Sequence, residues 1–304
     1  MVSSCLEKGK EKYNPSVVDR KKIDAVFGKD VSQVLFNHLY VVLDSISYAE
    51  LLLNDSWKST YATIDNGLPD FGHIDDATTS CYLRGHKHFI ELLGPNNAYN
   101  EPVGKSGIGF SLHNHGEHFH LGVVPKLKKT ETPYLSVYET VAMPLQEKRT
   151  TWFKAFYTPT KGSALQTWYA FYNPGFLDSL HHKEHQVYSR EAFLKNSYNN
   201  EHLFEGIESI AMTCTINDYE RIAQEMRHLS CKLIKKEGKS LTIASGDVFI
   251  TISPSDSISS SRITEIRCGL NENDTSVTQM GNLTITNTGI QSIWNLENQY
   301  KNEP

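Results

Sequence analysis

The sequence lacks most of the features that assign a chain to a class at first sight. No apolar run approaches the roughly 18 residues that span a bilayer. No basic stripe with interleaved aromatic residues suggests a nucleic-acid surface, and the net charge is −5. The nucleophile elbow GxSxG, the phosphate loop and a GxGxxG before a helix are also missing. The pattern therefore argues against a nucleic-acid binder, a serine hydrolase of the elbow type and a nucleotide-binding enzyme.

Cysteine is scarce and its spacing is uninformative for metal or disulfide frameworks. The five cysteines are Cys5, Cys81, Cys214, Cys231 and Cys268. Their number is odd and no CxxC pair occurs, so neither a zinc knuckle nor a disulfide scaffold is indicated. Three of them, Cys81, Cys214 and Cys268, lie in predicted strands, where we expect buried free thiols that act as small apolar residues.

Cys5 raises a separate question, because "VSSC" has the small-residue pattern that precedes a lipid-modified cysteine in bacterial lipoproteins. A polar, charged stretch follows it, and residues 1–30 are expected to form a flexible tether with little core. The apolar region that should precede such a cysteine is missing. Two localisations stay open: a lipoprotein of the bacterial cell envelope, facing the periplasm and anchored through a lipidated Cys5, or a cytoplasmic protein.

The remaining composition is that of an ordinary folded protein. Apolar residues make up 39% and charged residues 21% of 304 residues, which suits about two domains or one domain of repeated units. Tyrosine (15) and phenylalanine (13) are frequent. This favours strands and ligand-lined pockets over helical bundles.

An internal repeat organises the chain. The segments "HLYVVLDSISYAEL" and "SIAMTCTINDYERI" align without a gap and place His38 opposite Ser209. Further on, "HFIELLGP" aligns with "VFITISPS" and places Glu91 opposite Thr251. Hydrophobic periodicity predicts a strand, a helix and three strands in each copy, over about 34–95 and 206–270.

The part between the copies is less regular. It holds several predicted strands and resembles a degenerate third copy, in which "YAFYNP" matches "IELLGP" and Ala170 stands opposite Glu91. We therefore expect four parts, which are the tether, an N-terminal module with a degenerate middle module over 31–180, a helical linker over 181–205, and a C-terminal module over 206–304.

A unit that opens with a strand histidine and closes with "FIEL" resembles the vicinal oxygen chelate superfamily, which includes glyoxalase I, extradiol dioxygenases and bleomycin-resistance proteins. Within it the chain looks closest to a glyoxalase-like bacterial family of unknown function. The resemblance implies an α+β fold in which repeated βαβββ modules form cupped, incomplete β-barrels with helices outside. It also implies a divalent metal ion (Zn, Fe, Mn or Ni) bound by His38 and Glu91. Without a metal, His38 would be a satisfied core histidine and Glu91 a strand-edge carboxylate or a partner of Arg84.

The expected ligand set is incomplete, because the superfamily site usually takes three or four protein ligands. Ser209 and Thr251 are not typical ligands, and Ala170 cannot be one. The stretch "HNHGEHFH" offers His113 and His115 as further metal ligands, and it also partly matches the opening of a cupin motif. Either these histidines complete the site, or the site is a metal-free pocket.

The resemblance leads to a metal-dependent lyase, isomerase or dioxygenase that acts on a small, oxygen-rich molecule, with Glu91 as the catalytic proton carrier. We expect Tyr40, Trp152, Trp168 and Tyr172 to line the substrate pocket. Two alternatives remain: a non-catalytic small-molecule-binding protein on the same scaffold, and a cupin-like metal oxygenase that uses His113 and His115. The expected partner is a small molecule and not a nucleic acid.

Overall fold

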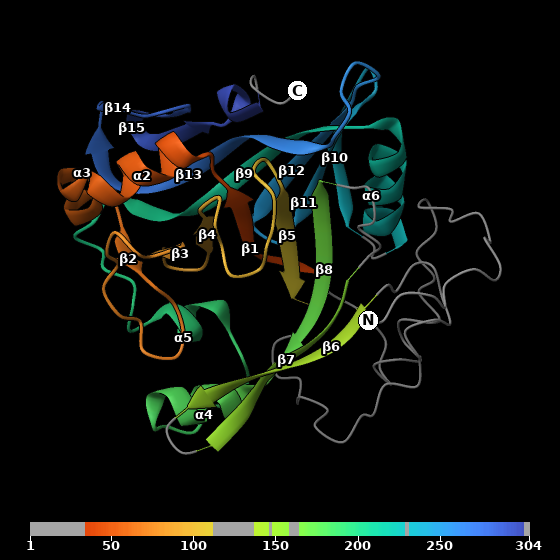
Figure 1. Cartoon of the computed structure of the whole chain (residues 1–304). Helices are drawn as coiled ribbons and strands as arrows, with labels where there is room; N and C mark the ends of the chain where they lie inside the picture. Colours follow the sequence, from red (N-terminus) through yellow and green to blue (C-terminus); the bar gives the residue numbers. More distant parts are fainter. Residues whose placement is uncertain (1–33, 112–136, 146–147, 158–163, 229–230, 301–304) are drawn as a thin grey trace, which may run out of the picture.

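A computed structural model describes residues 34–111, 137–145, 148–157, 164–228 and 231–300 (Figure 1). It has the mixed α+β architecture that the sequence predicts, and its strands form two large open sheets with few helices. Within these ranges no helix is long and apolar enough to cross a membrane. The predicted tether over 1–30 and Cys5 lie outside the described residues, so both localisations stay predictions.

The first sheet holds eight strands in the order β2-β3-β4-β1-β5-β8-β7-β6. Their bounds are β1 (Leu35–Val42), β2 (Thr63–Asp65), β3 (Ser80–Arg84), β4 (Phe89–Leu93), β5 (Ser106–Ser111), β6 (Val137–Leu145), β7 (Lys148–Tyr157) and β8 (Leu165–Tyr172). The order is symmetric about the β1–β5 pair. On one side β1 runs parallel to β4, and on the other β5 runs parallel to β8. Each half is completed by antiparallel neighbours.

The second sheet holds seven strands in the order β10-β11-β12-β9-β13-β15-β14. Their bounds are β9 (Phe204–Cys214), β10 (Lys232–Glu237), β11 (Ser240–Ser245), β12 (Val248–Pro254), β13 (Arg262–Asp274), β14 (Val277–Met280) and β15 (Leu283–Asn295). Here β9 runs parallel to β12, as β1 does to β4. The predicted helix of this segment is present as α6 (Ile216–His228) and connects β9 with β10 of the same sheet.

Short helices with side-chain caps make up most of the remaining elements. They are α2 (Ser45–Leu53), α3 (Asp55–Thr60), α4 (Pro174–His181), α5 (Arg190–Leu194) and the 3-10 helix η1 (Glu297–Tyr300). The sequence suggests one helix after β1, but two form. Asp44 caps the first through the backbone N–H of Ile46 and Ser47, and the Asn54 side chain caps the second through Trp57 N–H. A capping residue inside the helical stretch thus ends one helix and starts the next.

The two faces of the first sheet carry different cores. Period-two alternation sends Leu39 and Val41 of β1 into the largest apolar cluster, which also contains residues of the second sheet and of α6. The opposite face carries a smaller, strongly aromatic cluster that β4 and β7 share with α4 and α5. Figure 1 shows α4 beside the ends of β6 and β7. Because both faces are covered, the middle of this sheet is enclosed.

Candidate functional site

The two residues that the resemblance singles out line the same cavity. His38 lies beside Phe89 in the parallel β1–β4 register, and Tyr40 lies beside Glu91. Residues two apart on a strand share a face, so all four side chains belong to one side of the sheet. This side borders a cavity of about 530 Å³. The residues that line the cavity are His38, Tyr40, Asn66, Leu68, Ser80, Tyr82, Arg84, Phe89, Glu91, Leu93, Tyr99, Glu101, Val141, Met143, Trp152, Phe153, Gln166, Trp168 and Phe193.

His38 is held as a neutral imidazole. Its ring stacks on Phe89 at 4.1 Å between centroids and meets Trp168 edge-on at 5.0 Å. Its Nδ1 lies 2.7 Å from Asn37 Oδ1. Since an amide oxygen only accepts hydrogen bonds, Nδ1 carries the proton and Nε2 keeps its lone pair. Burial, helped by the charge of Arg84, lowers the pKa of His38 to about 3.

A strand irregularity places the partner of His38. The register of β1 against β5 shifts between Phe36 and His38, which allows Asn37 to lie beside its own neighbour. Asn37 Nδ2 donates to Ser111 Oγ (2.8 Å), and the Tyr172 hydroxyl donates to Asn37 Oδ1 (3.3 Å). Tyr172, predicted as a substrate contact, is thus not among the lining residues and orients His38 through Asn37. Tyr40, Trp152 and Trp168 do line the cavity.

Glu91 is a carboxyl group whose pKa lies near neutral pH. It accepts a hydrogen bond from the Tyr82 hydroxyl at 2.9 Å. Burial raises its pKa to about 7, although the Tyr82 hydrogen bond and the charge of Arg84 act in the opposite direction. Burial and the nearby Glu91 raise the pKa of Tyr82, so this phenol stays protonated and keeps donating. A carboxyl group with this pKa can both take up and release a proton at physiological pH.

Two glycines make room for the aromatic side chains over β5. Gly109 lies beside His38 and Gly107 beside Tyr40 in the antiparallel β1–β5 register. A Cβ atom on Gly109 would come within 2.5 Å of the Trp168 ring, and one on Gly107 within 2.4 Å of the Tyr40 ring. Any side chain here would displace those rings, so the glycines set the shape of the cavity.

Arg84 is a feature of the site that the sequence did not single out as functional. Its guanidinium donates from Nε and Nη2 to the two carboxylate oxygens of Asp65, both at 2.7 Å. It also lies 4.8 Å from the centroid of the Tyr82 ring and 5.2 Å from that of Phe89. Alternation in "SCYLRG" could have indicated it, since that pattern places Arg84 and Tyr82 on one face of β3.

The described residues offer a metal ion two suitable ligands, the Nε2 atom of His38 and the carboxylate of Glu91. Within the described ranges no set of three or more His, Cys, Asp or Glu side chains could hold a metal. Gly109 and Ala170 take the positions in β5 and β8 that correspond to His38 and Glu91, because Gly109 pairs with Trp168 as His38 pairs with Phe89. Neither has a ligand atom.

The two ligands therefore fit a metal in kind but fall short of the three or four that protein sites use. The further predicted ligands, His113 and His115, lie outside the described residues.

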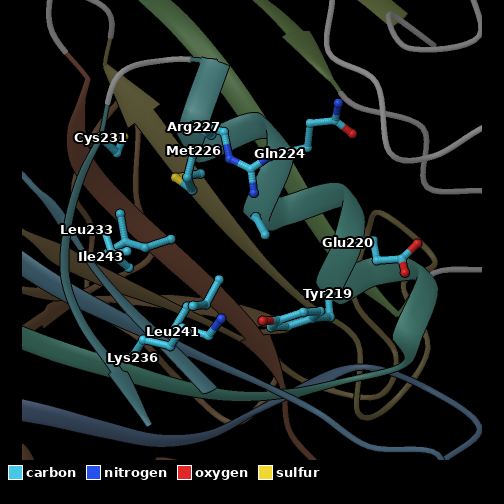
Figure 2. Close-up of a pocket in the computed structure, with 11 residues that line it drawn as sticks. Tyr219, Glu220, Gln224, Met226, Arg227, Cys231, Leu233, Lys236, Leu241 and Ile243 are labelled. Atoms are coloured by element: carbon cyan, nitrogen blue, oxygen red, sulfur yellow. The ribbon is translucent and has the colours of Figure 1, made fainter. Parts of the chain in front are cut away.

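A second cavity, of about 620 Å³, lies between α6 and the strands β10 and β11. Figure 2 shows Tyr219, Gln224 and Met226 on the helix, with Leu233 and Ile243 on the strand side. Its described lining contains one carboxylate and no histidine. It offers no histidine–carboxylate pair like the one that lines the first cavity, so we place the candidate site in the first sheet.

Comparison with known proteins gives a family and several distant structural likenesses, of which two are described below. No curated protein matches the chain. A hypothetical protein from Staphylococcus aureus is similar at 10% identity and a TM-score of 0.43, over 73% of this chain and 87% of the other. A mutant of 4-hydroxymandelate synthase from Streptomyces coelicolor is similar at 11% identity and a TM-score of 0.34, over 74% of this chain and 63% of the other. A family of unknown function, DUF5829, matches residues 36–296, and the protein therefore belongs to this family.

Proposed function

We propose that the protein is a glyoxalase-like enzyme that binds a small, oxygen-rich molecule in the cavity of the first sheet and moves a proton through Glu91. The observation that carries the proposal is a carboxyl group with a pKa of about 7 that lines this cavity together with a neutral histidine. Such pairs of titratable groups with shifted pKa values in one cavity are typical of acid–base sites.

The arrangement of strands supports the glyoxalase-like part of the proposal. In the units 34–95 and 206–270, the strands β1 to β4 and β9 to β12 pair in the same order, and a helical stretch follows the first strand of each. Their registers also agree, because His38 pairs with Phe89 as Ser209 pairs with Phe249. We therefore propose that the fold is built from repeated βαβββ modules, and that the symmetric first sheet is the cupped, incomplete barrel of the vicinal oxygen chelate type.

The chemistry follows from the atoms that reach the cavity. Ionised Glu91 accepts a proton from a substrate carbon next to a carbonyl group, and the protonated carboxyl then returns it to the same or a neighbouring atom. Tyr82 holds the carboxylate in place through its hydroxyl. His38 Nε2 accepts a hydrogen bond from a substrate hydroxyl, because Nδ1 is already bound to Asn37. The aromatic walls exclude water from these groups.

A metal-dependent form of this activity needs ligands beyond His38 and Glu91, and His113 and His115 are the candidates from the sequence. The cupin-like alternative depends on the same two histidines. Elemental analysis of the purified protein and of the His38→Ala variant tests this part. A stoichiometric metal that is lost in the variant supports it, and a metal-free wild type contradicts it.

A second candidate is a small-molecule-binding protein on the same scaffold that changes no bond. The observation in its favour is the largely aromatic and aliphatic lining, which includes Tyr40, Trp152 and Trp168. Pockets of this kind bind ligands through apolar burial with a few polar contacts.

Solvent-deuterium exchange distinguishes the two candidates. A panel of 2-oxo acids and α-hydroxyketones is incubated with the protein in D₂O, and loss of the proton at the carbon next to the carbonyl is followed by NMR. The enzyme is expected to exchange this proton for at least one compound, and Glu91→Gln to slow the exchange by about 100-fold or more while still binding. Binding without exchange supports the second candidate. Exchange that persists in Glu91→Gln contradicts the proposed role of Glu91.

A further inference from the structure

Arg84 is a buried cation whose hydrogen-bonding capacity is only partly used. Its side chain is 2% exposed, yet it lines the cavity. A guanidinium has five N–H donors, and those of Nε and Nη2 supply the two hydrogen bonds to Asp65. Nη1 makes no hydrogen bond with the described residues. Nη1 is not one of the fully buried, unpaired atoms of the described residues, so it keeps some contact with the cavity and can donate to an acceptor that a ligand brings.

The guanidinium is also held in place before any ligand binds. Three aromatic rings lie about it, those of Phe71 (5.2 Å), Tyr82 (4.8 Å) and Phe89 (5.2 Å). The same carboxylate that pairs with it accepts a hydrogen bond from the backbone N–H of Gly67 at 2.7 Å. A fixed donor group binds its partner with a smaller loss of side-chain entropy than a mobile one.

The charges around the cavity single out Arg84. Of the residues that line it, the described ones include two acids, Glu91 and Glu101, and one arginine. Glu101 forms an ion pair with Lys105. The charge of Arg84 lowers the pKa of both His38 and Glu91, so its field reaches the centre of the site.

We propose that Arg84 binds a carboxylate of the ligand through Nη1, and that the ligand is therefore an aromatic or apolar carboxylic acid of the 2-oxo acid class. This inference rests on the proposed function and names its substrate class. Arginine is suited to the task because its planar fork matches a carboxylate, and the rings around it suit an apolar body.

The spacing of Arg84 and Glu91 agrees with this class. Arg84 of β3 lies beside Phe89 of β4, and Glu91 follows two residues later on the same face. Two residues along a strand span about 7 Å. A carboxylate at Arg84 thus leaves the carbons that follow it within reach of Glu91, where a proton next to a carbonyl would be removed.

Matched pairs of ligands test the inference. The probes are phenylpyruvate, phenylacetate and 3-phenylpropionate, with the neutral amides phenylacetamide and 3-phenylpropanamide for comparison, and binding is measured by calorimetry. The wild type is expected to bind the carboxylates about tenfold or more tightly than their amides, the range of a charge-assisted hydrogen bond.

Variants of Arg84 and Asp65 test whether the preference for carboxylates over amides comes from Arg84. Because Arg84→Gln alone leaves Asp65 buried and unpaired, it is combined with Asp65→Asn, which removes both charges. The double variant should lose the preference for carboxylates and keep its affinity for the amides. Asp65→Asn alone should increase the preference, since the charge of Arg84 is no longer offset. Arg267→Gln, a half-exposed arginine of the second sheet, is the matched control and should change nothing.

The outcomes separate the inference from the proposed function. Equal binding of carboxylates and amides by the wild type, or a preference that survives in the double variant, overturns the inference. If Trp168→Ala weakens amide binding in that case, the proposed cavity still stands. If no probe binds, and thus Trp168→Ala changes nothing, the inference and the proposed cavity both fail.

Discussion

The unit over 34–95 and the unit over 206–270 share one strand pairing and carry different chemistry. Where the first has His38 and Glu91, the second has Ser209 and Thr251 in the same register. The imidazole and the carboxyl are replaced by two hydroxyls, and the Thr251 hydroxyl bonds to that of Thr242 on the neighbouring strand (2.9 Å). Equal backbone arrangements therefore do not imply equal sites.

The antiparallel strands that pair with β1 and with β9 differ in the same sense. Beside His38 and Tyr40 lie Gly109 and Gly107 of β5. Beside Ser209 and Ala211 lie Arg267 and Glu265 of β13, and these two form an ion pair at 2.6 Å. Glycines leave space for Trp168 and Tyr40 to lie over the strand, whereas the ion pair fills that space with its own side chains. Thus, of these two strands, β5 leaves room over its backbone for aromatic side chains and β13 does not.

Enclosure is the third difference. Four of the five residues of β4 are buried, and the other, Glu91, is partly buried. In β12 buried and partly exposed residues alternate, and Phe249, which corresponds to Phe89, is 47% exposed. The aromatic cluster shared by β7, α4 and α5 covers the first face. A low-dielectric cavity, and with it the shifted pKa values, follows from this cover.

The second unit nevertheless supports the first sheet, which holds the candidate site. Glu225 of α6 accepts hydrogen bonds from Tyr169 (2.5 Å) and Thr167 (2.8 Å) of β8, and Arg221 donates to its other oxygen at 2.6 Å. Alternation along β8 turns Gln166 and Trp168 to the cavity. The helix of one unit thus holds the back of a strand whose front lines the site of the other.

Loss of this support is expected to have the largest effect. Arg221→Met leaves the carboxylates of Glu225 and Asp218 buried without their cation, which should cost about 3–5 kcal/mol of the free energy of unfolding. Urea unfolding measures it. The double variant Arg221→Met, Glu225→Met removes both charges and should recover part of the loss. A single variant that loses less than about 1 kcal/mol would show that α6 does not hold β8.

Adding a side chain at Gly109, over which the Trp168 ring lies, is expected to have the next largest effect. Gly109→Ala brings a Cβ atom against Trp168, and such overpacking costs about 1–3 kcal/mol and should close the cavity to ligands. The control is Arg267→Ala at the corresponding position of the second unit, where we expect a change below about 0.5 kcal/mol. If both substitutions lowered stability equally in thermal unfolding, the proposed difference in free space over β5 and β13 would be wrong.

The titration of Glu91 should make the contribution of the first unit to the free energy of unfolding depend on pH, whereas Thr251 of the second unit contributes no such dependence. Its pKa is raised from 4.5 to about 7 in the folded protein, so the folded state binds more protons than the unfolded state between these values. Stability contributed by this group is complete below pH 4.5 and is lost as the pH rises through 7.

Glu91→Gln should therefore be more stable than the wild type at pH 8, by up to about 3 kcal/mol because each unit of the pKa shift is equivalent to about 1.4 kcal/mol, and nearly equal to it at pH 4. Urea unfolding at the two pH values measures the difference. Thr251→Ser in the second unit provides the control without pH dependence. A Glu91→Gln variant that parallels the wild type at all pH values would contradict the raised pKa.

The smallest effect is expected on the face of β12 that carries the exposed Phe249 side chain. Phe249→Ser removes a side chain that is about half exposed, so the free energy of unfolding should change by about 0.5 kcal/mol or less. Thermal unfolding checks this. A loss of several kcal/mol would mean that a partner or another part of the chain covers this face, and the contrast in enclosure would then weaken.

Local patterns in the sequence predict the order of elements well. The strand around His38, the β3–β4 hairpin and α6 follow from alternation and helical periodicity. The site needs information that no local pattern contains. The roles of Arg84 and Gly109 depend on the register between strands distant in sequence, and Tyr172 is linked to His38 through Asn37.

The most direct test of the central claim is the pKa of Glu91 itself. The wild type is labelled with ¹³C at glutamate side-chain carboxyls, the signal of Glu91 is assigned by its loss in Glu91→Gln, and its shift is followed by NMR against pH. A midpoint near 7 is the predicted result, because burial disfavours the ionised form of the carboxyl. A midpoint near 4.5, the ordinary value, would show a solvated carboxylate and would contradict an acid–base site in the first sheet.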